Sequence, residues 1–173
     1  MFRLDGKVAI VTGVGSVGSG WGNGRATATL LARAGAAIYG VDIVRESAVD
    51  TREIIVGEGG TCLVREVDMR DPAAVEAAVL DCVATFGRVD VLVNNVGGSV
   101  PGGPAEMTVE TWDEQIALNL RTAFLGCKFV LGAMVEQGSG VIVNVASVAG
   151  IREHSGRVNG AYSASKAAVI ELS

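Results

Sequence analysis

Residues 8–25, VAIVTGVGSVGSGWGNGR, join a short apolar run to a glycine-rich turn and then to the start of a helix. Glycines let backbone N–H groups approach a pyrophosphate closely, and the N-terminus of the following helix supplies a favourable dipole. A strand, a glycine-rich turn and a helix in this order are the context that such a phosphate-binding loop requires. The stretch therefore predicts the first strand and the first helix of a nucleotide-binding α/β domain.

Apolar runs and helical periodicity alternate along the rest of the chain. Strands are expected at 8–11, 37–41, 61–67, 89–93 and 141–145. Helices are expected at 25–34, at 45–56, from Asp71-Pro72 onward, from 108 to about 137 and from about 161. Strands that are apolar on both faces and alternate with helices indicate a parallel sheet covered on both sides. We predict one Rossmann-like doubly wound domain over residues 1–173, with strand order 3-2-1-4-5.

Asp42 closes the second predicted strand. A carboxylate at this position can accept hydrogen bonds from both ribose hydroxyls of NAD, and it repels the 2′-phosphate of NADP. NAD is therefore the expected cofactor, and NADP is less favoured. Taken alone, the same aspartate could also be a helix cap.

Tyr162 and Lys166 are four residues apart in the last predicted helix, and Ser147 lies upstream at the end of the fifth strand. Side chains at i and i+4 project from the same face of a helix. A cation beside a tyrosine favours the phenolate and lowers the phenol pKa from about 10, which makes a general acid/base. Such a pair alone could also be a solvated helix face.

Composition argues against several classes of protein. Hydrophobic residues make up 49% of the chain, charged residues 19%, and the net charge is −5. With few basic residues in any one run, a nucleic-acid or anionic-membrane surface is not expected. Apolar runs are broken by glycine or charge, so a membrane span is not expected either. No signal peptide is recognisable, and a cytoplasmic protein with buried free thiols at Cys62, Cys82 and Cys127 is predicted.

With these residues in hand, the chain resembles the short-chain dehydrogenase/reductase family, in its single-domain branch. The matching motifs occur in the family's order from residue 7 to the last residue. They are Thr12-Gly13 with Gly22-Asn23-Gly24, Asp68 after the third strand, Asn94-Asn95-Val96-Gly97 after the fourth, Asn119, Ser147, Tyr162 and Lys166.

The resemblance implies a role for each of these residues. Tyr162 would transfer a proton to or from the substrate oxygen, and Lys166 would lower its pKa and bind the nicotinamide ribose. Ser147 would hydrogen-bond the substrate oxygen, and Asn119 would hold a water that links Lys166 to solvent. The remaining residues would bind cofactor: Gly13, Gly22, Asn23 and Gly24 at the phosphates, Asp68 and the backbone of Met69 at adenine, and Asn95 at the adenosine ribose.

Two features depart from the family's pattern. The glycine loop carries about five extra residues, Val17 to Trp21, which we expect to bulge outward and leave Gly22 and Gly24 at the helix entrance. Asn23 also replaces the apolar residue usual between the last two glycines. In addition, the chain ends at Ser173, whereas family members continue through two more strands. We therefore expect a fragment of a longer enzyme, with strand 141–145 as an exposed apolar edge.

The favoured hypothesis is an NAD-dependent oxidoreductase that interconverts a secondary alcohol and a ketone. A 3-oxoacyl-thioester reductase is an alternative within this class, although such reductases commonly use NADPH. A non-catalytic nucleotide-binding or assembly module is the alternative from another class, and an epimerase or dehydratase of the related larger branch is more distant. Substrate choice would fall to the loops at 98–107 and 149–160, which include Arg152, Glu153, His154 and Arg157.

The resemblance also implies assembly, because in the family the long helix and the tyrosine helix pack against a second subunit. Here the long helix carries apolar residues that could serve core and interface together: Ile116, Leu120, Phe124 and Val130. We predict a homo-oligomer, either a dimer or a tetramer.

Overall fold

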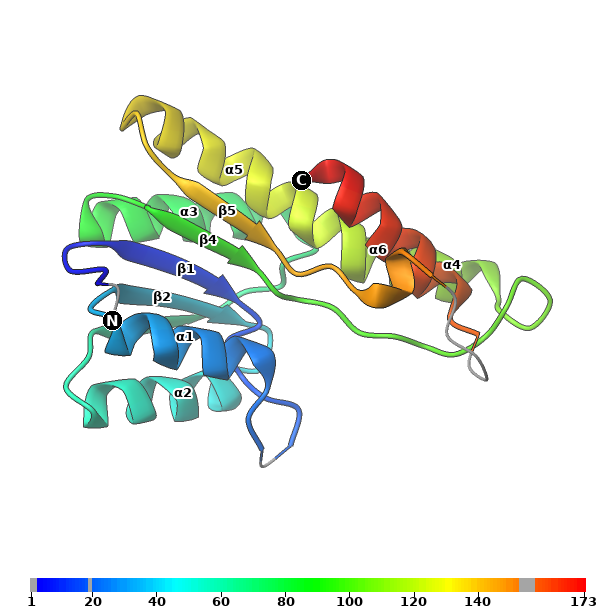
Figure 1. The fold of residues 1–173 in the computed structure, drawn as a ribbon, viewed down its shortest axis with the longest axis horizontal. Helices are drawn as coiled ribbons and strands as arrows, with labels where there is room; N and C mark the ends of the chain where they lie inside the picture. The colour runs from blue at the N-terminus through cyan, green and yellow to red at the C-terminus, as the bar shows by residue number, and fades with distance from the viewer. Residues whose placement is uncertain (1–2, 19, 153–157) are drawn as a thin grey trace.

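The computed structural model describes residues 3–18, 20–152 and 158–173. Its sheet is parallel and has the predicted order β3-β2-β1-β4-β5 (Figure 1). The strands are β1 (Val8–Thr12), β2 (Ala37–Asp42), β3 (Cys62–Glu66), β4 (Val91–Asn94) and β5 (Val141–Asn144). The α-helices are α1 (Asn23–Arg33), α2 (Arg45–Gly57), α3 (Pro72–Phe86), α4 (Val109–Ile116), α5 (Thr122–Glu136) and α6 (Gly160–Leu172).

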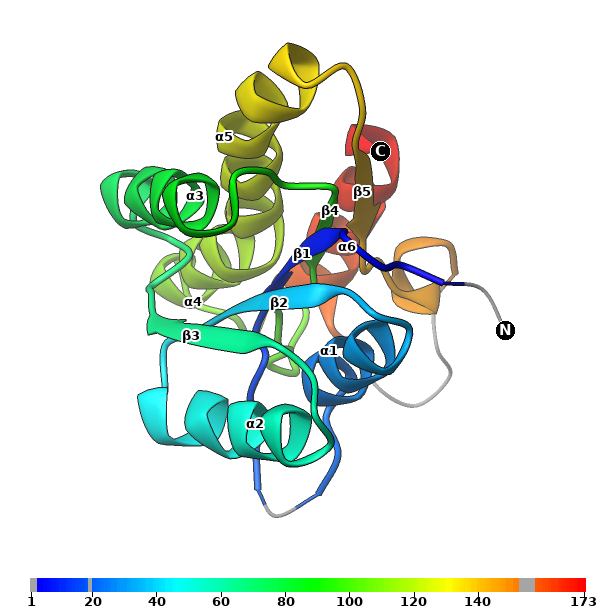
Figure 2. The ribbon, with the colours of Figure 1, turned by 90° about the vertical axis from the view of Figure 1, so that its left-hand side faces the viewer.

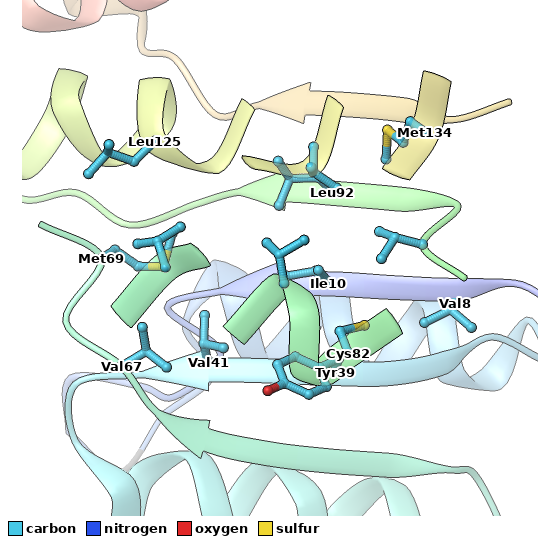
Figure 3. Close-up of a cluster of buried hydrophobic side chains, with 14 residues drawn as sticks. Val8, Ile10, Tyr39, Val41, Val67, Met69, Cys82, Leu92, Leu125 and Met134 are labelled. Carbon is cyan, nitrogen blue, oxygen red and sulfur yellow. The ribbon is translucent and has the colours of Figure 1, made fainter. Parts of the chain in front are cut away.

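Helices cover both faces of this sheet, as expected for a doubly wound fold. Figure 2 shows α1 and α2 on one face, with α3, α4 and α5 on the other. The apolar core is correspondingly divided in two. One cluster, which includes Val11, Ile38 and Ile55, lies between the sheet and the pair α1 and α2. The other, which includes Tyr39, Leu92 and Leu125, lies between the sheet and the helices α3 and α5 (Figure 3).

An apolar stripe on α3 faces this second cluster. Val75, Val79 and Cys82 are buried, and their partly buried neighbours pack against the same cluster. The helix begins where the sequence predicts, because the Asp71 carboxylate accepts a hydrogen bond from the Ala73 N–H at 2.9 Å. It ends at Gly87, whose φ of +78° is the left-handed conformation that favours glycine.

The long helix predicted from residue 108 to about 137 is continuous but not uniform. Thr108 caps it by accepting a hydrogen bond from the Thr111 N–H, and a π-helical turn, Ala117–Arg121, separates α4 from α5. Val109–Glu136 is long and apolar enough to cross a membrane by length and composition, which the sequence analysis did not anticipate. It nevertheless buries Leu125, Val130 and Met134 in the core, as the central helix of a covered sheet does.

The three cysteines are free thiols. Cys82 is fully buried, whereas Cys62 and Cys127 are only partly buried, so the expectation of burial is wrong in degree for those two. Burial raises the pKa of the Cys62 and Cys82 thiols to about 12. These two thiols therefore stay protonated and act as small apolar side chains.

Candidate active site

The carboxyl ends of the parallel strands meet at one edge of the sheet, where the loops after β1 and β4 are hydrogen-bonded to each other. The Thr12 hydroxyl accepts a hydrogen bond from the Asn95 N–H at 3.0 Å. The Asn95 amide nitrogen in turn donates to the carbonyls of Thr12 and Gly13, each at 3.0 Å. Asn95, expected at the adenosine ribose, therefore also holds the glycine loop against the end of β4.

At Gly13 and Gly24 the glycine loop is packed so tightly that it forms a cradle with no room for a side chain. Gly13 has a φ of +63°, and a Cβ atom on Gly24 would overlap the Gly13 carbonyl. Gly22 is the N-cap of α1, and no side chain in the described part of the loop caps this helix. Among the described residues, the first-turn N–H groups of α1 therefore have no side-chain partner, which fits the pyrophosphate of a dinucleotide. Asn23, the first residue of the helix, is exposed.

Asp42 lies at the end of β2 beside this loop. One carboxylate oxygen accepts a hydrogen bond from the Gly15 N–H at 2.8 Å, and the other accepts one from the Val44 N–H at 2.9 Å. A Cβ atom on Gly15 would lie 3.0 Å from the first of these oxygens, so glycine is needed there for space. The backbone thus fixes the carboxylate in position, and its remaining lone pairs can accept hydrogen bonds from a diol.

Arg25, which the sequence analysis did not single out, is a buried residue of this region with an exposed fraction of 7%. Its guanidinium donates to the Thr51 hydroxyl at 3.0 Å, and to the carbonyls of Gly20 at 3.3 Å and Ser47 at 3.4 Å. The Thr51 hydroxyl donates in turn to the Val14 carbonyl at 2.9 Å. Arg25 therefore joins the glycine loop to α2. In the sequence, the only indication of this role is that Arg25 lies in the first turn of a predicted helix that follows an unusually long loop.

The two residues expected at adenine lie after β3, but their side chains are used within the protein. Asp68 forms an ion pair with Arg70 at 2.7 Å, and the hydrogen bond from Arg70 lowers the pKa of this carboxyl. The Met69 side chain is buried in the core (Figure 3), which leaves its backbone for the expected contact. The ion pair between Asp68 and Arg70 was not predicted, because two charged residues beside a turn are usually both exposed to solvent.

Lys166 and Tyr162 share one face of α6, as their spacing predicts. The Lys166 side chain is buried, and its Nζ atom donates to the Val145 carbonyl at 2.6 Å and lies 5.8 Å from the centre of the Tyr162 ring. Burial lowers the pKa of the Lys166 ammonium. A cation is thus held against an aromatic ring whose residue is only partly buried.

Asn119 lies in the π-helical turn, and its amide group makes three hydrogen bonds that leave one lone pair of the oxygen for a further donor. It accepts a hydrogen bond from the Gly98 N–H at 3.0 Å and donates to the carbonyls of Gly98 and Gln115, each at 2.9 Å. A Cβ atom on Gly97 would lie 2.7 Å from the Asn119 oxygen and 3.3 Å from Lys166 Nζ. Asn119 and Lys166 therefore converge on Gly97, and Asn119 fixes the backbone there.

Ser147 follows β5 and caps a short 3-10 turn, Val148–Gly150, by accepting a hydrogen bond from the Ala149 N–H at 3.2 Å. That turn packs closely on α6. A Cβ atom on Gly150 would lie 2.7 Å from backbone atoms of Lys166 and Ala167. The close approach fixes Ser147 relative to the helix that carries Tyr162.

The two loops expected to select substrate are bonded to each other. The Gly102 N–H donates to the Val158 carbonyl at 2.9 Å, and the Gly160 N–H donates to the Gly102 carbonyl at 3.0 Å. The Asn159 side-chain oxygen between them is buried and has no hydrogen-bond partner among the residues that the structure describes. Nearby is a cavity of 260 Å³ whose lining is mainly apolar and includes Met107 and Trp112.

Arg152 is exposed, whereas Glu153, His154 and Arg157, also named from the sequence, lie outside the described residues. Within the described ranges, no group of three or more His, Cys, Asp or Glu side chains could hold a metal ion.

Comparison with known proteins agrees with the resemblance to this family. The short chain dehydrogenase family model matches residues 7–173. D-Threitol dehydrogenase of Mycolicibacterium smegmatis is 40% identical over 172 residues, which are 99% of this chain and 64% of that protein. The 3-oxoacyl-[acyl-carrier-protein] reductase FabG of Thermotoga maritima is 36% identical over 98% of this chain and 66% of its own length. The chain thus spans slightly less than two thirds of the length of these relatives.

Solved structures agree in fold. A protein from Burkholderia xenovorans described as a short-chain dehydrogenase/reductase has a TM-score of 0.96 and 48% identity, over 99% of this chain and 68% of its own. A 7α-hydroxysteroid dehydrogenase complexed with NADH and 7-oxo glycochenodeoxycholic acid has a TM-score of 0.89 and 32% identity, over 98% of this chain and 64% of its own. The chain belongs to the short-chain dehydrogenase family.

Proposed function

We propose that the protein is an NAD-dependent oxidoreductase that interconverts a secondary alcohol and a ketone. The observation that carries this proposal is the buried Lys166 ammonium, held 5.8 Å from the Tyr162 ring and converging with Asn119 on Gly97. A buried cation beside a phenol favours ionisation of that phenol, which a proton-transfer catalyst needs. Family membership and the dehydrogenases among the relatives support the same reaction class.

The cradle around Gly13 and Gly24 supports a dinucleotide as the cofactor, with its pyrophosphate at the first turn of α1 and its adenosine ribose at Asp42. Gly22, Asn23, Asp68, Met69 and Asn95 complete the proposed cofactor site. When bound, the nicotinamide cofactor supplies the hydride acceptor or donor, which no side chain can provide.

The side chains supply orientation and proton transfer. Tyr162 gives a proton to the substrate oxygen during reduction and takes one during oxidation, and Lys166 stabilises the phenolate and binds the nicotinamide ribose. Ser147 donates a hydrogen bond to the same substrate oxygen. Asn119 holds the Gly98 backbone and, in this proposal, a water that connects Lys166 to solvent.

NAD is favoured over NADP because of Asp42. Both carboxylate oxygens accept backbone N–H groups, so the charge is fixed at the loop and would repel a 2′-phosphate. A neighbour of known structure is complexed with NADH. The test compares turnover with NADH and NADPH on a panel of ketones. Equal rates, or faster turnover with NADPH, would contradict the Asp42 argument.

The alternative within the class is a 3-oxoacyl-thioester reductase, which the similarity to FabG favours. A 3-oxoacyl thioester included in the ketone panel distinguishes this reaction from simple ketone reduction. The alternative of a non-catalytic nucleotide-binding module is tested by measuring NAD binding and alcohol oxidation on one sample. Binding without turnover of any alcohol or ketone would favour the module.

The proposal includes a small-molecule substrate, a homo-oligomeric assembly and a cytoplasmic location. Free cysteines are consistent with a reducing compartment. The assembly is supported by exposed apolar side chains on one face of α5, namely Phe124, Leu131 and Val135.

A further inference from the structure

The segment that leads into α1, Gly20–Gly22, carries a large exposed aromatic side chain next to the N-cap of this helix. Trp21 has an exposed fraction of 58% and directly precedes Gly22, the N-cap of α1. Of the extra residues, Val17 is fully exposed, and the loop closes at its base. A Cβ atom on Gly22 would lie 3.4 Å from the Gly15 carbonyl oxygen. Trp21 therefore lies where the loop returns to the phosphate-binding turn.

The protein fixes this segment by burying a charge. Arg25 donates to the Gly20 carbonyl with one branch of its guanidinium, and its other nitrogens contact Thr51 and Ser47 of α2. Its ion-pair partner Asp50 is 3.6 Å away and largely exposed. Burying a guanidinium is costly unless hydrogen bonds compensate.

The same contacts fix the loop relative to the proposed ribose site. The Ser16 N–H donates to the Ser47 hydroxyl at 2.7 Å, and that hydroxyl donates back to the Ser16 carbonyl at 3.0 Å. The adjacent Gly15 N–H contacts the Asp42 carboxylate. The segment that carries Trp21 is thus held against the elements that carry Asp42 and the first turn of α1.

We propose that Trp21 is a cofactor-binding residue whose indole covers the pyrophosphate and adenosine part of bound NAD, and that Arg25 is the residue that positions it. An indole offers a large rigid surface, and binding is favoured when the planar base of a nucleotide excludes water from that surface. The inference rests on the proposed function for the presence of a dinucleotide, and it assigns a role to the extra residues of this loop.

The test uses the fact that the chain has two tryptophans. The Trp112→Phe variant leaves Trp21 as its only indole, and the Trp21→Phe variant leaves Trp112. Trp112 lines the cavity near α4 and is 40% exposed. Acrylamide quenching is measured from fluorescence lifetimes with and without saturating NAD⁺. We expect NAD⁺ to reduce the quenching of Trp21 by about twofold or more as its exposed face is covered, and to leave the quenching of Trp112 nearly unchanged.

Calorimetry on the same proteins completes the test. Trp21→Ala should weaken NAD⁺ binding by about tenfold, whereas Trp112→Phe should bind as the wild type does. Arg25→Lys keeps the charge but loses the forked contacts, so it should bind NAD⁺ more weakly and increase the quenching of Trp21 before NAD⁺ is added.

The outcomes separate this inference from the proposed function. If the wild type binds NAD⁺ but Trp21 stays equally accessible and Trp21→Ala binds normally, the inference alone is overturned. If the wild type does not bind NAD⁺, the proposed function is overturned as well. Shielding of Trp21 that rises with protein concentration, without NAD⁺, would indicate a protein contact and also contradict the inference.

Discussion

Lys166 and Tyr162 lie one turn apart on α6, and their surroundings differ. The Lys166 ammonium is buried and has the Val145 carbonyl as its hydrogen-bond acceptor, so its charge is poorly solvated. An ammonium in this setting interacts strongly with any negative charge that develops nearby, because the local dielectric is low. The partly buried Tyr162 phenol can provide that negative charge.

Replacing Tyr162 with phenylalanine should abolish turnover and spare cofactor binding. The change removes the proposed proton donor, so kcat should fall by about 10²–10⁴-fold. The affinity for NAD should change by less than about twofold, because little binding surface is lost. Steady-state kinetics and calorimetry measure the two effects.

The chain's other tyrosine is the matched control. Tyr39 lies on β2, far from Tyr162 in the sequence. It is buried and donates a hydrogen bond to Asp81 at 2.7 Å. Tyr39→Phe should keep kcat and lower the free energy of unfolding by about 1 kcal/mol. If Tyr162→Phe kept most of the wild-type activity, the acid/base assignment would be wrong.

Asp90 should make stability depend on acid pH. Burial raises the pKa of its carboxyl, but hydrogen bonds from Arg88, Lys7 and the Val8 N–H outweigh burial and lower the pKa to about 2. Because the folded-state pKa is below the usual value of about 3.9, the stabilisation is fully present above that value and is lost as the pH falls through about 2.

The Asp90→Asn variant measures this contribution. At pH 7 it should be less stable than the wild type by about 2 kcal/mol, and the difference should shrink between pH 4 and pH 2. Urea unfolding at several pH values gives the comparison. Asp113→Asn, a change at an exposed position of α4, should show no such gap at any pH. A gap for Asp90→Asn that stays constant down to pH 2 would contradict the ion-pair account.

At the scale of elements, two glycines of α5 have opposite structural roles. A Cβ atom on Gly126 would overlap the Asn94 side-chain oxygen and lie 3.1 Å from its Cγ atom, whereas one on Gly132 would meet nothing within 4 Å. Gly126→Ala should therefore destabilise the fold by about 1–3 kcal/mol, because α5 must move away from the end of β4. Gly132→Ala should stabilise it by about 0.5–1 kcal/mol through helix propensity.

Urea unfolding of the two variants decides between packing and propensity. Both changes add one methyl group to the same helix, so propensity alone predicts that both variants gain stability. A gain in the free energy of unfolding for both variants would show that α5 does not approach β4 closely at Gly126. Since Asn94 also donates to the Asn144 side chain at 2.8 Å, a shift there should disturb the ends of two strands.

Helices and strands were predictable from the sequence where the spacing of apolar residues agreed with the capping residues and with the glycines and prolines that end an element. Thr108 and Asp71 cap helices as predicted, and the glycine loop kept Gly22 and Gly24 at the entrance to α1. The π-helical turn at Ala117–Arg121 was not predictable, because one extra residue per turn barely disturbs an apolar pattern that is already dense.

The candidate site was predictable only as a set of residues. Motifs predict Asn119 and Lys166 as site residues, but not the contacts that fix them: the Gly98 backbone for Asn119 and the Val145 carbonyl for Lys166. The burial of Arg25 left no signal either, since arginine is usually exposed and its partners come from a different helix. Local patterns therefore predict candidate residues, while long-range packing decides how each is held.

At the scale of the whole molecule, the outer face of α5 is a surface suited to self-association. Phe124, Leu131 and Val135 recur at i, i+7 and i+11 on this helix, with exposed fractions of 48%, 47% and 75%. Single exposed apolar residues are ordinary, but three on one helix face form a patch of the kind that subunit interfaces cover. A twofold axis beside α5 would let the same face cover itself in a second copy.

Placing charge on this face should therefore produce monomers without unfolding the protein. In Phe124→Glu with Leu131→Glu, two carboxylates per subunit would be buried against their symmetry mates, at a cost that a weak apolar interface cannot offset. Leu30→Glu is the control, because Leu30 is 60% exposed on α1, across the sheet from α5 (Figure 2). Light scattering at micromolar concentration should give an oligomer for the wild type and the control but a monomer for the double variant, all with similar circular dichroism. A wild-type monomer would remove the prediction. If the double variant is still an oligomer, the subunits associate through another surface, and the exposed apolar residues of α5 are not part of the interface.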